Sequence, residues 1–76
     1  MKIEYDKEVD AVYIYLQCKQ VDQTLEIQEG INLDLDVDGK LIGLEILDAT
    51  KKYALSDIFN LTTENLILDE GILASA

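Results

Sequence analysis

The sequence predicts an α+β fold in which a small antiparallel β-sheet is followed by short C-terminal helices packed on it. Apolar and polar residues alternate with a period of two through most of residues 2–47, an Asp-Gly pair interrupts the alternation at 38–39, and the period changes after Leu47. A period of two is typical of strands with one dry and one wet face, whereas helices bury residues three and four positions apart. We expect a meander of about four strands.

The clearest predicted element is a β-hairpin over residues 31–47. Apolar residues occupy every second position from Ile31 to Val37, and Asp38-Gly39 then offers the two positive-φ positions of a type I′ turn. That two-residue loop pairs apolar residues on one side of the hairpin, namely Leu35 with Ile42, Leu33 with Leu44 and Ile31 with Ile46, and it pairs Val37 with Lys40. The predicted wet face holds Asn32, Asp34 and Asp36, and a slip of one residue would expose the apolar side chains.

A first hairpin is expected at the N-terminus. Residues 2–5 and 11–16 are rich in β-branched and aromatic residues, which suit a pleated surface, and Asp6–Asp10 would connect them. The second of these runs places its aliphatic side chains on one face and Tyr13 and Tyr15 on the other. Tyrosines are favoured at protein interfaces because they are large and amphipathic. The alternative is that the C-terminal segment packs over them.

Residues 24–28 resume the alternation before the central hairpin, with Leu25 and Ile27 on the dry face. The same face continues into residue 31 if one long strand is bulged at Gly30. A three-residue corner that pairs Ile27 with Ile31 would preserve the face as well, whereas a two-residue turn would not.

The C-terminal part is expected to be helical at first. Asp48 is a plausible N-cap for residues 49–54, and Ser56 for residues 57–60. Residues 62–68 fit either a short helix or an edge strand. We expect a single domain over 1–76, with the sheet in 1–51 and an α or mixed part in 52–76. The side chains spaced to cover one face of the sheet are Tyr53, Leu55, Ile58 and Phe59.

Charge and missing residue types exclude several functions. The chain has 16 acidic and six basic residues, a formal net charge of −10, and no histidine. Such a charge repels nucleic-acid phosphates and attracts basic proteins and divalent cations. The lack of histidine removes the usual zinc sites and the serine triad. The single cysteine, Cys18, has no histidine to activate it and cannot form an internal disulfide, so we expect a cytoplasmic protein without cofactor, nucleic-acid or membrane binding.

A calcium-loop pattern overlaps the central hairpin. The pattern D-x-D-x-D-G-x5-E is matched by Asp34, Asp36, Asp38, Gly39 and Glu45. A strand, however, places alternate carboxylates about 6.6 to 6.8 Å apart, too far for one ion to collect three of them. We therefore favour a solvated acidic face and keep these four acidic residues as weak metal candidates. Asp6, Glu8 and Asp10 could likewise form a cation site or an acid/base pair, but a solvated turn is favoured.

Two stretches resemble a known family. The opening Y-D-K-E-V-D-A-V-Y-I-Y-L and the central E-G-I-N-L-D-L-D-V-D-G-K-L-I-G-L-E-I-L-D-A-T resemble the domain-of-unknown-function family 2283 of bacteria and archaea, over about residues 1–51. The resemblance implies a small antiparallel β domain with α structure at its C-terminus. It brings no established activity and no catalytic residues. Some relatives are thought to be encoded beside small toxin-like proteins, which implies an antitoxin-like role.

Together these observations predict an uncharacterised acidic, non-enzymatic protein-interaction or oligomerisation domain. It would form a homodimer or bind a basic protein. The alternative is a calcium- or magnesium-binding protein, or a metal-dependent enzyme, that uses Asp34, Asp36 and Asp38. The interface candidates are Tyr13, Tyr15, Ile58, Phe59, Leu66 and Leu68.

Overall fold

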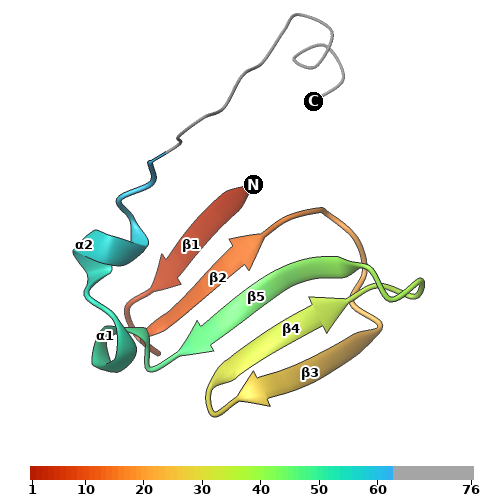
Figure 1. The fold of residues 1–76 in the computed structure, drawn as a ribbon, viewed down its shortest axis with the longest axis horizontal. Coiled ribbons are helices and arrows are strands. Elements are labelled where there is room, and N and C mark those ends of the chain that lie inside the picture. The colour runs from red at the N-terminus through yellow and green to blue at the C-terminus, as the bar shows by residue number, and fades with distance from the viewer. Residues whose placement is uncertain (63–76) are drawn as a thin grey trace, which may run out of the picture.

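The computed structural model describes residues 1–62 and contains a five-stranded antiparallel sheet followed by two short helices (Figure 1). This confirms the predicted α+β class, with five strands rather than about four. The elements are β1 (Lys2–Asp6), β2 (Ala11–Tyr15), β3 (Gln23–Gln28), β4 (Ile31–Leu35), β5 (Leu41–Leu47), α1 (Ala49–Lys52) and α2 (Leu55–Ile58).

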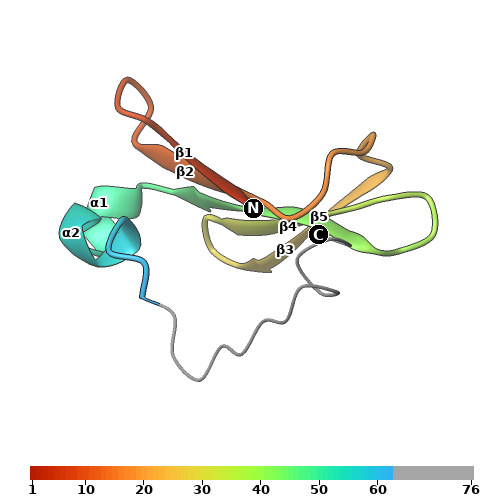
Figure 2. The same ribbon diagram turned by 90° about the horizontal axis from the view of Figure 1, so that it is seen from above.

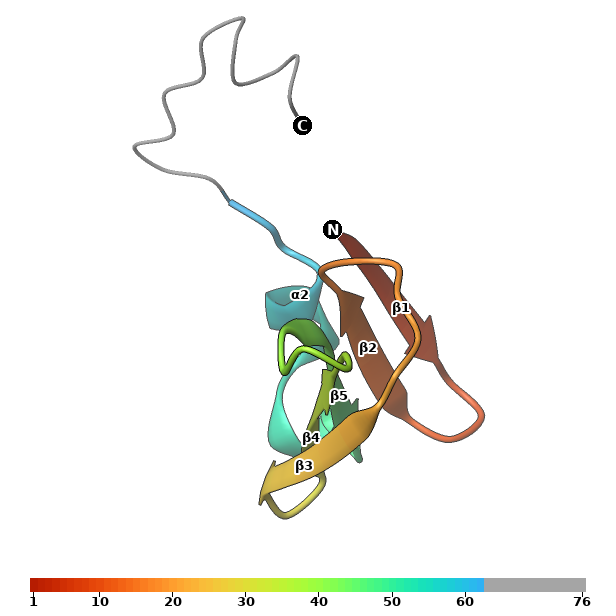
Figure 3. The same ribbon diagram turned by 90° about the vertical axis from the view of Figure 1, so that its right-hand side faces the viewer.

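The strand order is β1-β2-β5-β4-β3, which places β5 at the centre of the sheet. Short turns connect β1 to β2, β3 to β4 and β4 to β5, so these antiparallel neighbours are local in sequence. The pairing of β2 with β5 is the long-range step that joins the first hairpin to the meander. The sheet is visibly twisted between its edge strands β1 and β3 (Figure 3), as expected for strands of L-residues.

The register aligns apolar side chains across the sheet on one face. One row consists of Ile3, Ile14, Leu44, Leu33 and Leu25. A second row consists of Tyr5, Val12, Ile46 and Ile31. The predicted pairs Ile31 with Ile46 and Leu33 with Leu44 are confirmed. Val12, in the second row, is fully buried.

The predicted two-residue turn between β4 and β5 is wrong. The Asp36 N–H donates to the Lys40 carbonyl at 2.9 Å, and the Gly39 N–H donates to the Asp36 carbonyl at 2.9 Å, so the loop has three residues rather than two. Of the two positions predicted to have positive φ, Gly39 does, at 78°, and Asp38 does not. A three-residue loop with a left-handed last residue is the next most common hairpin connection.

The physical reason for this turn is the side chain of Asp36. Its carboxylate accepts hydrogen bonds from the Asp38 and Lys40 N–H groups, both at 2.9 Å. Asp36 is therefore only 5% exposed, although it was predicted to lie on the wet face. The extra loop residue shifts the register, so Leu35 pairs with Leu41 and not with Ile42.

The turn between β3 and β4 has two residues, Glu29 and Gly30, because Gln28 pairs with Ile31. A two-residue turn by itself would place the apolar side chains of β3 and those of β4 on opposite faces of the sheet. The register shift between Glu26 and Gln28 compensates by bulging the strand at Ile27. Both predictions for this segment, one long strand bulged at Gly30 and a three-residue corner that pairs Ile27 with Ile31, are therefore wrong. Gly30 instead provides a positive φ of 75° for the turn.

The start of α1 is stabilised by a residue far away in the sequence. Asp48 is its N-cap residue, as predicted, but it has a left-handed φ of 51° and makes no side-chain capping hydrogen bond. Asp10 supplies those bonds instead. Its carboxylate accepts from the Thr50 N–H at 3.1 Å and from the Thr50 hydroxyl at 2.7 Å, and its carbonyl accepts from the Ala49 N–H at 2.9 Å.

The helices differ from the prediction in length and position. Ser56 lies inside α2, whose N-cap residue is Ala54. Both helices lie at one end of the sheet (Figure 2), where the Phe59 ring meets the Tyr5 ring edge-on at 6.2 Å. Tyr53 and Phe59 remain 47% and 46% exposed, so the predicted cover of the apolar face is partial. No helix within residues 1–62 has the length and apolar character needed to cross a membrane.

Candidate functional site

The face opposite the apolar rows carries polar and aromatic side chains, and we call it the polar face. The alternation of each strand places one row of Lys2, Tyr15, Gly43, Asp34 and Thr24 on it. A second row consists of Glu4, Tyr13, Glu45, Asn32 and Glu26. Acidic side chains from β1, β3, β4 and β5 therefore lie on one surface with two tyrosines from β2.

Tyr13 crosses a neighbouring strand to reach its hydrogen-bond partner. Its hydroxyl donates to Asp34 on β4, although β5 lies between the two strands. The crossing is open because Gly43 has no side chain. A Cβ at Gly43 would lie 2.5 Å from Cε1 of Tyr13 and 2.6 Å from the Ile14 carbonyl oxygen. The other carboxylate oxygen of Asp34 accepts from the Thr24 hydroxyl at 2.6 Å, which extends the network to β3.

Burial, together with the hydrogen bond to Asp34, raises the pKa of Tyr13 well above its usual range. The phenol therefore stays protonated at neutral pH and acts as a hydrogen-bond donor. Such an arrangement ties three strands together, and it leaves this tyrosine unsuited to act as a general base.

Tyr15 lies beside Tyr13 and next to an ion pair. The two rings are 4.4 Å apart between centroids, with an interplanar angle of 48°. The Lys2 ammonium lies 2.6 Å from the Glu4 carboxylate and 5.0 Å from the centroid of the Tyr15 ring. The Tyr15 hydroxyl also donates to Glu4 at 3.3 Å. Hydrogen bonding to Glu4 raises the pKa of Lys2, and the same contact lowers the pKa of Glu4.

The weak metal candidates do not form one cluster. Asp34 lies in β4 and Glu45 in β5, where Glu45 accepts a hydrogen bond from Asn32 at 3.2 Å. Asp36 and Asp38 lie in the turn, and the Lys40 N–H lowers the pKa of Asp36 by hydrogen bonding to its carboxylate. Within residues 1–62, no group of three or more His, Cys, Asp and Glu side chains is arranged to hold a metal ion.

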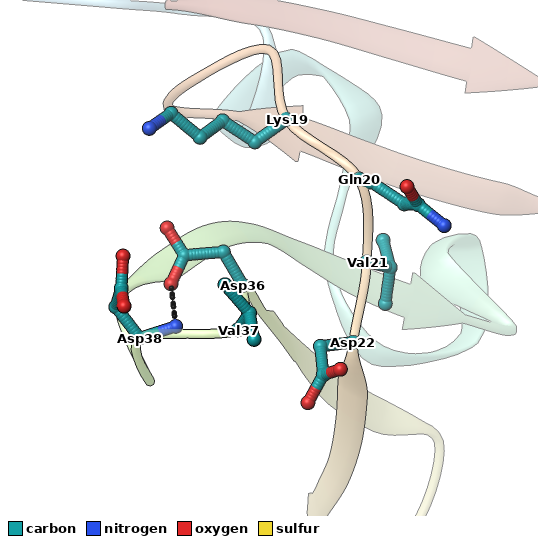
Figure 4. A pocket seen from close by; sticks show the side chains of 7 residues that line it. All are labelled: Lys19, Gln20, Val21, Asp22, Asp36, Val37 and Asp38. Atoms are coloured by element: carbon teal, nitrogen blue, oxygen red, sulfur yellow. Dashed lines mark hydrogen bonds between the residues drawn. The ribbon is translucent and has the colours of Figure 1, made fainter.

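A separate hollow of about 390 Å³ lies beside this turn, between it and the loop that leads from β2 to β3 (Figure 4). Asp36 faces into it but already serves the turn through its bond to the Asp38 N–H. The attraction of Lys19 further lowers the pKa of Asp36. The hollow is lined by Lys19, Gln20, Val21, Asp22, Asp36, Val37 and Asp38. The contacts of Asp36 stabilise the turn, and they give no indication of a ligand for the hollow.

The structure separates the interface candidates. Tyr13 and Tyr15 are half-buried neighbours on the polar face. Ile58 and Phe59 lie at the helical end, where Phe59 contacts Tyr5. Leu66 and Leu68 lie outside the described residues, as does the predicted helix or strand at 62–68 beyond Thr62.

In the turn between β1 and β2, Asp6 and Asp10 make hydrogen bonds that stabilise the local structure. Asp6 accepts a hydrogen bond from the Glu8 N–H at 2.9 Å, and Asp10 binds Thr50 and the Tyr5 hydroxyl. Cys18 is a free, exposed thiol. Sequence reasoning missed Gly43 and Thr24. A lone glycine within the strand pattern at 41–47 was the available signal, because such a residue often marks close approach of another group.

Comparisons with known proteins give a family but no activity. An uncharacterized protein of Methanocaldococcus jannaschii is 35% identical over 72 residues, which cover 95% of this chain and 60% of that protein. A Methanosarcina mazei protein named as a candidate hypoxanthine phosphoribosyltransferase is 34% identical over 55 residues, which cover 72% of this chain and 44% of that protein. The chain thus spans 60% or less of the length of these relatives. No solved structure is significantly similar to the chain. The model of the protein family of unknown function DUF2283 matches residues 2–49, and the chain belongs to that family.

Proposed function

We propose that this chain is a non-enzymatic protein-interaction domain that self-associates through the apolar face of its sheet. The observation that carries the proposal is the exposure of apolar side chains on that face, just after β2 and along the edge strand β3. Leu16, Leu25 and Ile27 are 50%, 40% and 56% exposed. Large apolar side chains left exposed on one face of a small domain are typical of an interaction site.

Charge favours a second copy as the occupant of this face. The chain carries a net charge of −10, so two copies repel each other unless they meet on a neutral surface. The aligned apolar rows contain no charged side chain, whereas Glu4, Glu45, Asp34 and Glu26 lie on the polar face. Packing two apolar faces together points both acidic faces outward and buries surface that a domain this small lacks.

The oligomeric state tests this proposal. We expect light scattering to show a dimer for the wild-type chain and a monomer for the double variant Leu25→Gln and Ile27→Gln. Glu26→Gln is the matched control, because it introduces the same residue between these two positions on the opposite face. A monomeric wild-type chain would overturn self-association. If shortening that monomer after Thr62 created a dimer, residues 63–76 would be the occupant instead.

The acidic surface also supports binding of a basic protein, including the antitoxin-like pairing that the family resemblance implies. Co-expression with the protein encoded beside this chain and recovery of a salt-sensitive complex would support that role. Recovery of neither that protein nor any basic protein at low salt would count against it. The transferase named for the Methanosarcina mazei protein is not proposed for this chain, because the match covers 44% of that protein.

A further inference from the structure

A second hollow lies on the polar face where β1, β2 and β5 meet. Its volume is about 230 Å³, and its lining includes three carboxylates, Glu4, Asp6 and Glu45, and two aromatic rings, Tyr13 and Tyr15. Among residues 1–62, no basic residue lines it. Glu4 and Asp6 lie on β1 and Glu45 lies on β5, so the register of the sheet fixes the spacing between the two strands' carboxylates.

These carboxylates keep free hydrogen-bonding capacity. Glu45 accepts one bond from Asn32, Asp6 accepts one from the Glu8 N–H, and Glu4 is shared between Lys2 and Tyr15. An ionised carboxylate has about four acceptor positions. A cationic group that entered the hollow would therefore find both unpaired lone pairs and the faces or edges of two rings.

Lys2 shows within the chain how this surface receives a cation. Its ammonium contacts the Glu4 carboxylate at 2.6 Å and lies 5.0 Å from the Tyr15 centroid, within the range of a cation–π interaction. Lys2 does not line the hollow, which extends from Glu4 toward Glu45. The Lys2 ammonium thus lies at the edge of the hollow, and the Asp6 and Glu45 carboxylates line the hollow beyond Glu4.

We propose that this hollow binds an arginine or lysine side chain of a basic polypeptide, held by Glu4 and Glu45 and packed against Tyr13 and Tyr15. The partner is a polypeptide because its backbone can follow the polar face while one side chain enters the hollow. Complementary charge favours such a partner over nucleic acid, since the net charge is −10. The site lies on the face opposite the proposed dimer surface, so it does not depend on self-association.

Titration with a hexa-arginine peptide, followed by amide chemical shifts of the full chain, tests the proposal. We expect saturable shifts centred on β1, β2 and β5. Glu45→Gln should weaken binding about two- to fivefold, the range of one exposed charge contact or cation–π contact. The glutamine oxygen can still accept the bond from Asn32, so the fold should persist. Glu26→Gln is the matched control, because it removes the same charge from the same row of the face.

Lys2 provides the opposite test. Lys2→Gln frees Glu4 and the Tyr15 ring and should tighten peptide binding. Lys51→Gln, which removes another exposed, ion-paired cation from α1, should tighten it less. Equal effects within either pair of variants would show general electrostatic attraction and overturn the site. Shifts centred elsewhere, or no saturable binding, would also overturn it. The double variant Leu25→Gln and Ile27→Gln should bind the peptide as the wild-type chain does, which separates this outcome from failure of the dimer.

Discussion

At the scale of single residues, Gly43 is required by the contact between β2 and β4. The Tyr13 ring lies over it, and the Ile14 carbonyl approaches from the neighbouring strand. We expect Gly43→Ala to destabilise the fold by about 1 to 3 kcal/mol, the usual cost of adding atoms to a packed position. Urea unfolding would measure this free energy. Gly43→Ala as stable as the wild-type chain would contradict the close approach.

Tyr13 should be the last tyrosine to ionise, because the pKa of Tyr5 is also raised, by its hydrogen bond to Asp10, but by less. The pKa of Tyr13 is raised because burial and Asp34 favour the neutral phenol. Its contribution to stability is therefore complete below the ordinary tyrosine pKa of about 10 and is lost as pH rises through the higher folded value. We expect an ultraviolet titration to show a tyrosine that ionises late and to lose that phase in Tyr13→Phe. An unchanged titration in this variant would contradict the Asp34 contact.

At the scale of elements, Asp10 anchors α1 to the first hairpin. We expect Asp10→Gly to lower the melting temperature by roughly 4–8 °C and to speed hydrogen exchange at the Thr50 amide, because the start of α1 loses the carboxylate that accepts from Thr50. Glycine keeps the positive φ of 54°, so backbone strain does not enter. Asp48→Gly is the matched control, with a φ of 51° but no capping hydrogen bond. Equal losses in the two variants would exclude the anchor.

The carboxylates of Asp10 and Asp36 should make the fold less stable at acidic pH. Hydrogen bonds from Thr50 lower the pKa of Asp10, and those from Lys40 and Asp38 lower the pKa of Asp36. Both groups therefore stabilise the fold above the unfolded aspartate pKa of about 3.9, and this stabilisation is lost as pH falls through the lower folded values. Thermal unfolding should show a steep fall in the melting temperature below about pH 4 that is shallower in Asp10→Gly. Identical acid slopes would contradict this.

The sequence predicts the strand faces of this molecule because alternation is local, and the pairs Ile31 with Ile46 and Leu33 with Leu44 follow from it. It does not predict the turn after β4, because the Asp36 side chain competes with backbone pairing there. The bulge at Ile27 and the bond from Thr50 to Asp10 depend on distant partners. For the site, the sequence predicts Tyr13 and Tyr15 as surface aromatics, but the hydrogen bond from Tyr13 to Asp34 requires β5 to pair with both β2 and β4.

At the scale of the whole molecule, the net charge of −10 makes the folded chain repel itself. Added salt screens exposed charges, with a Debye length of about 10 Å at 0.1 M, so the melting temperature should rise with ionic strength. Screening alone predicts equal rises in sodium chloride and magnesium chloride at matched ionic strength.

A magnesium or calcium site would raise the melting temperature further in the divalent salt, since a ligand at 100 times its Kd contributes about 2.7 kcal/mol to the free energy of unfolding. We expect no such excess, because Asp34 already binds Tyr13 and Thr24, Asp36 binds N–H groups of its own turn, and within residues 1–62 no three such side chains are arranged to hold a metal ion. A larger effect of the divalent salt that disappears in Asp34→Asn would revive the metal-binding alternative.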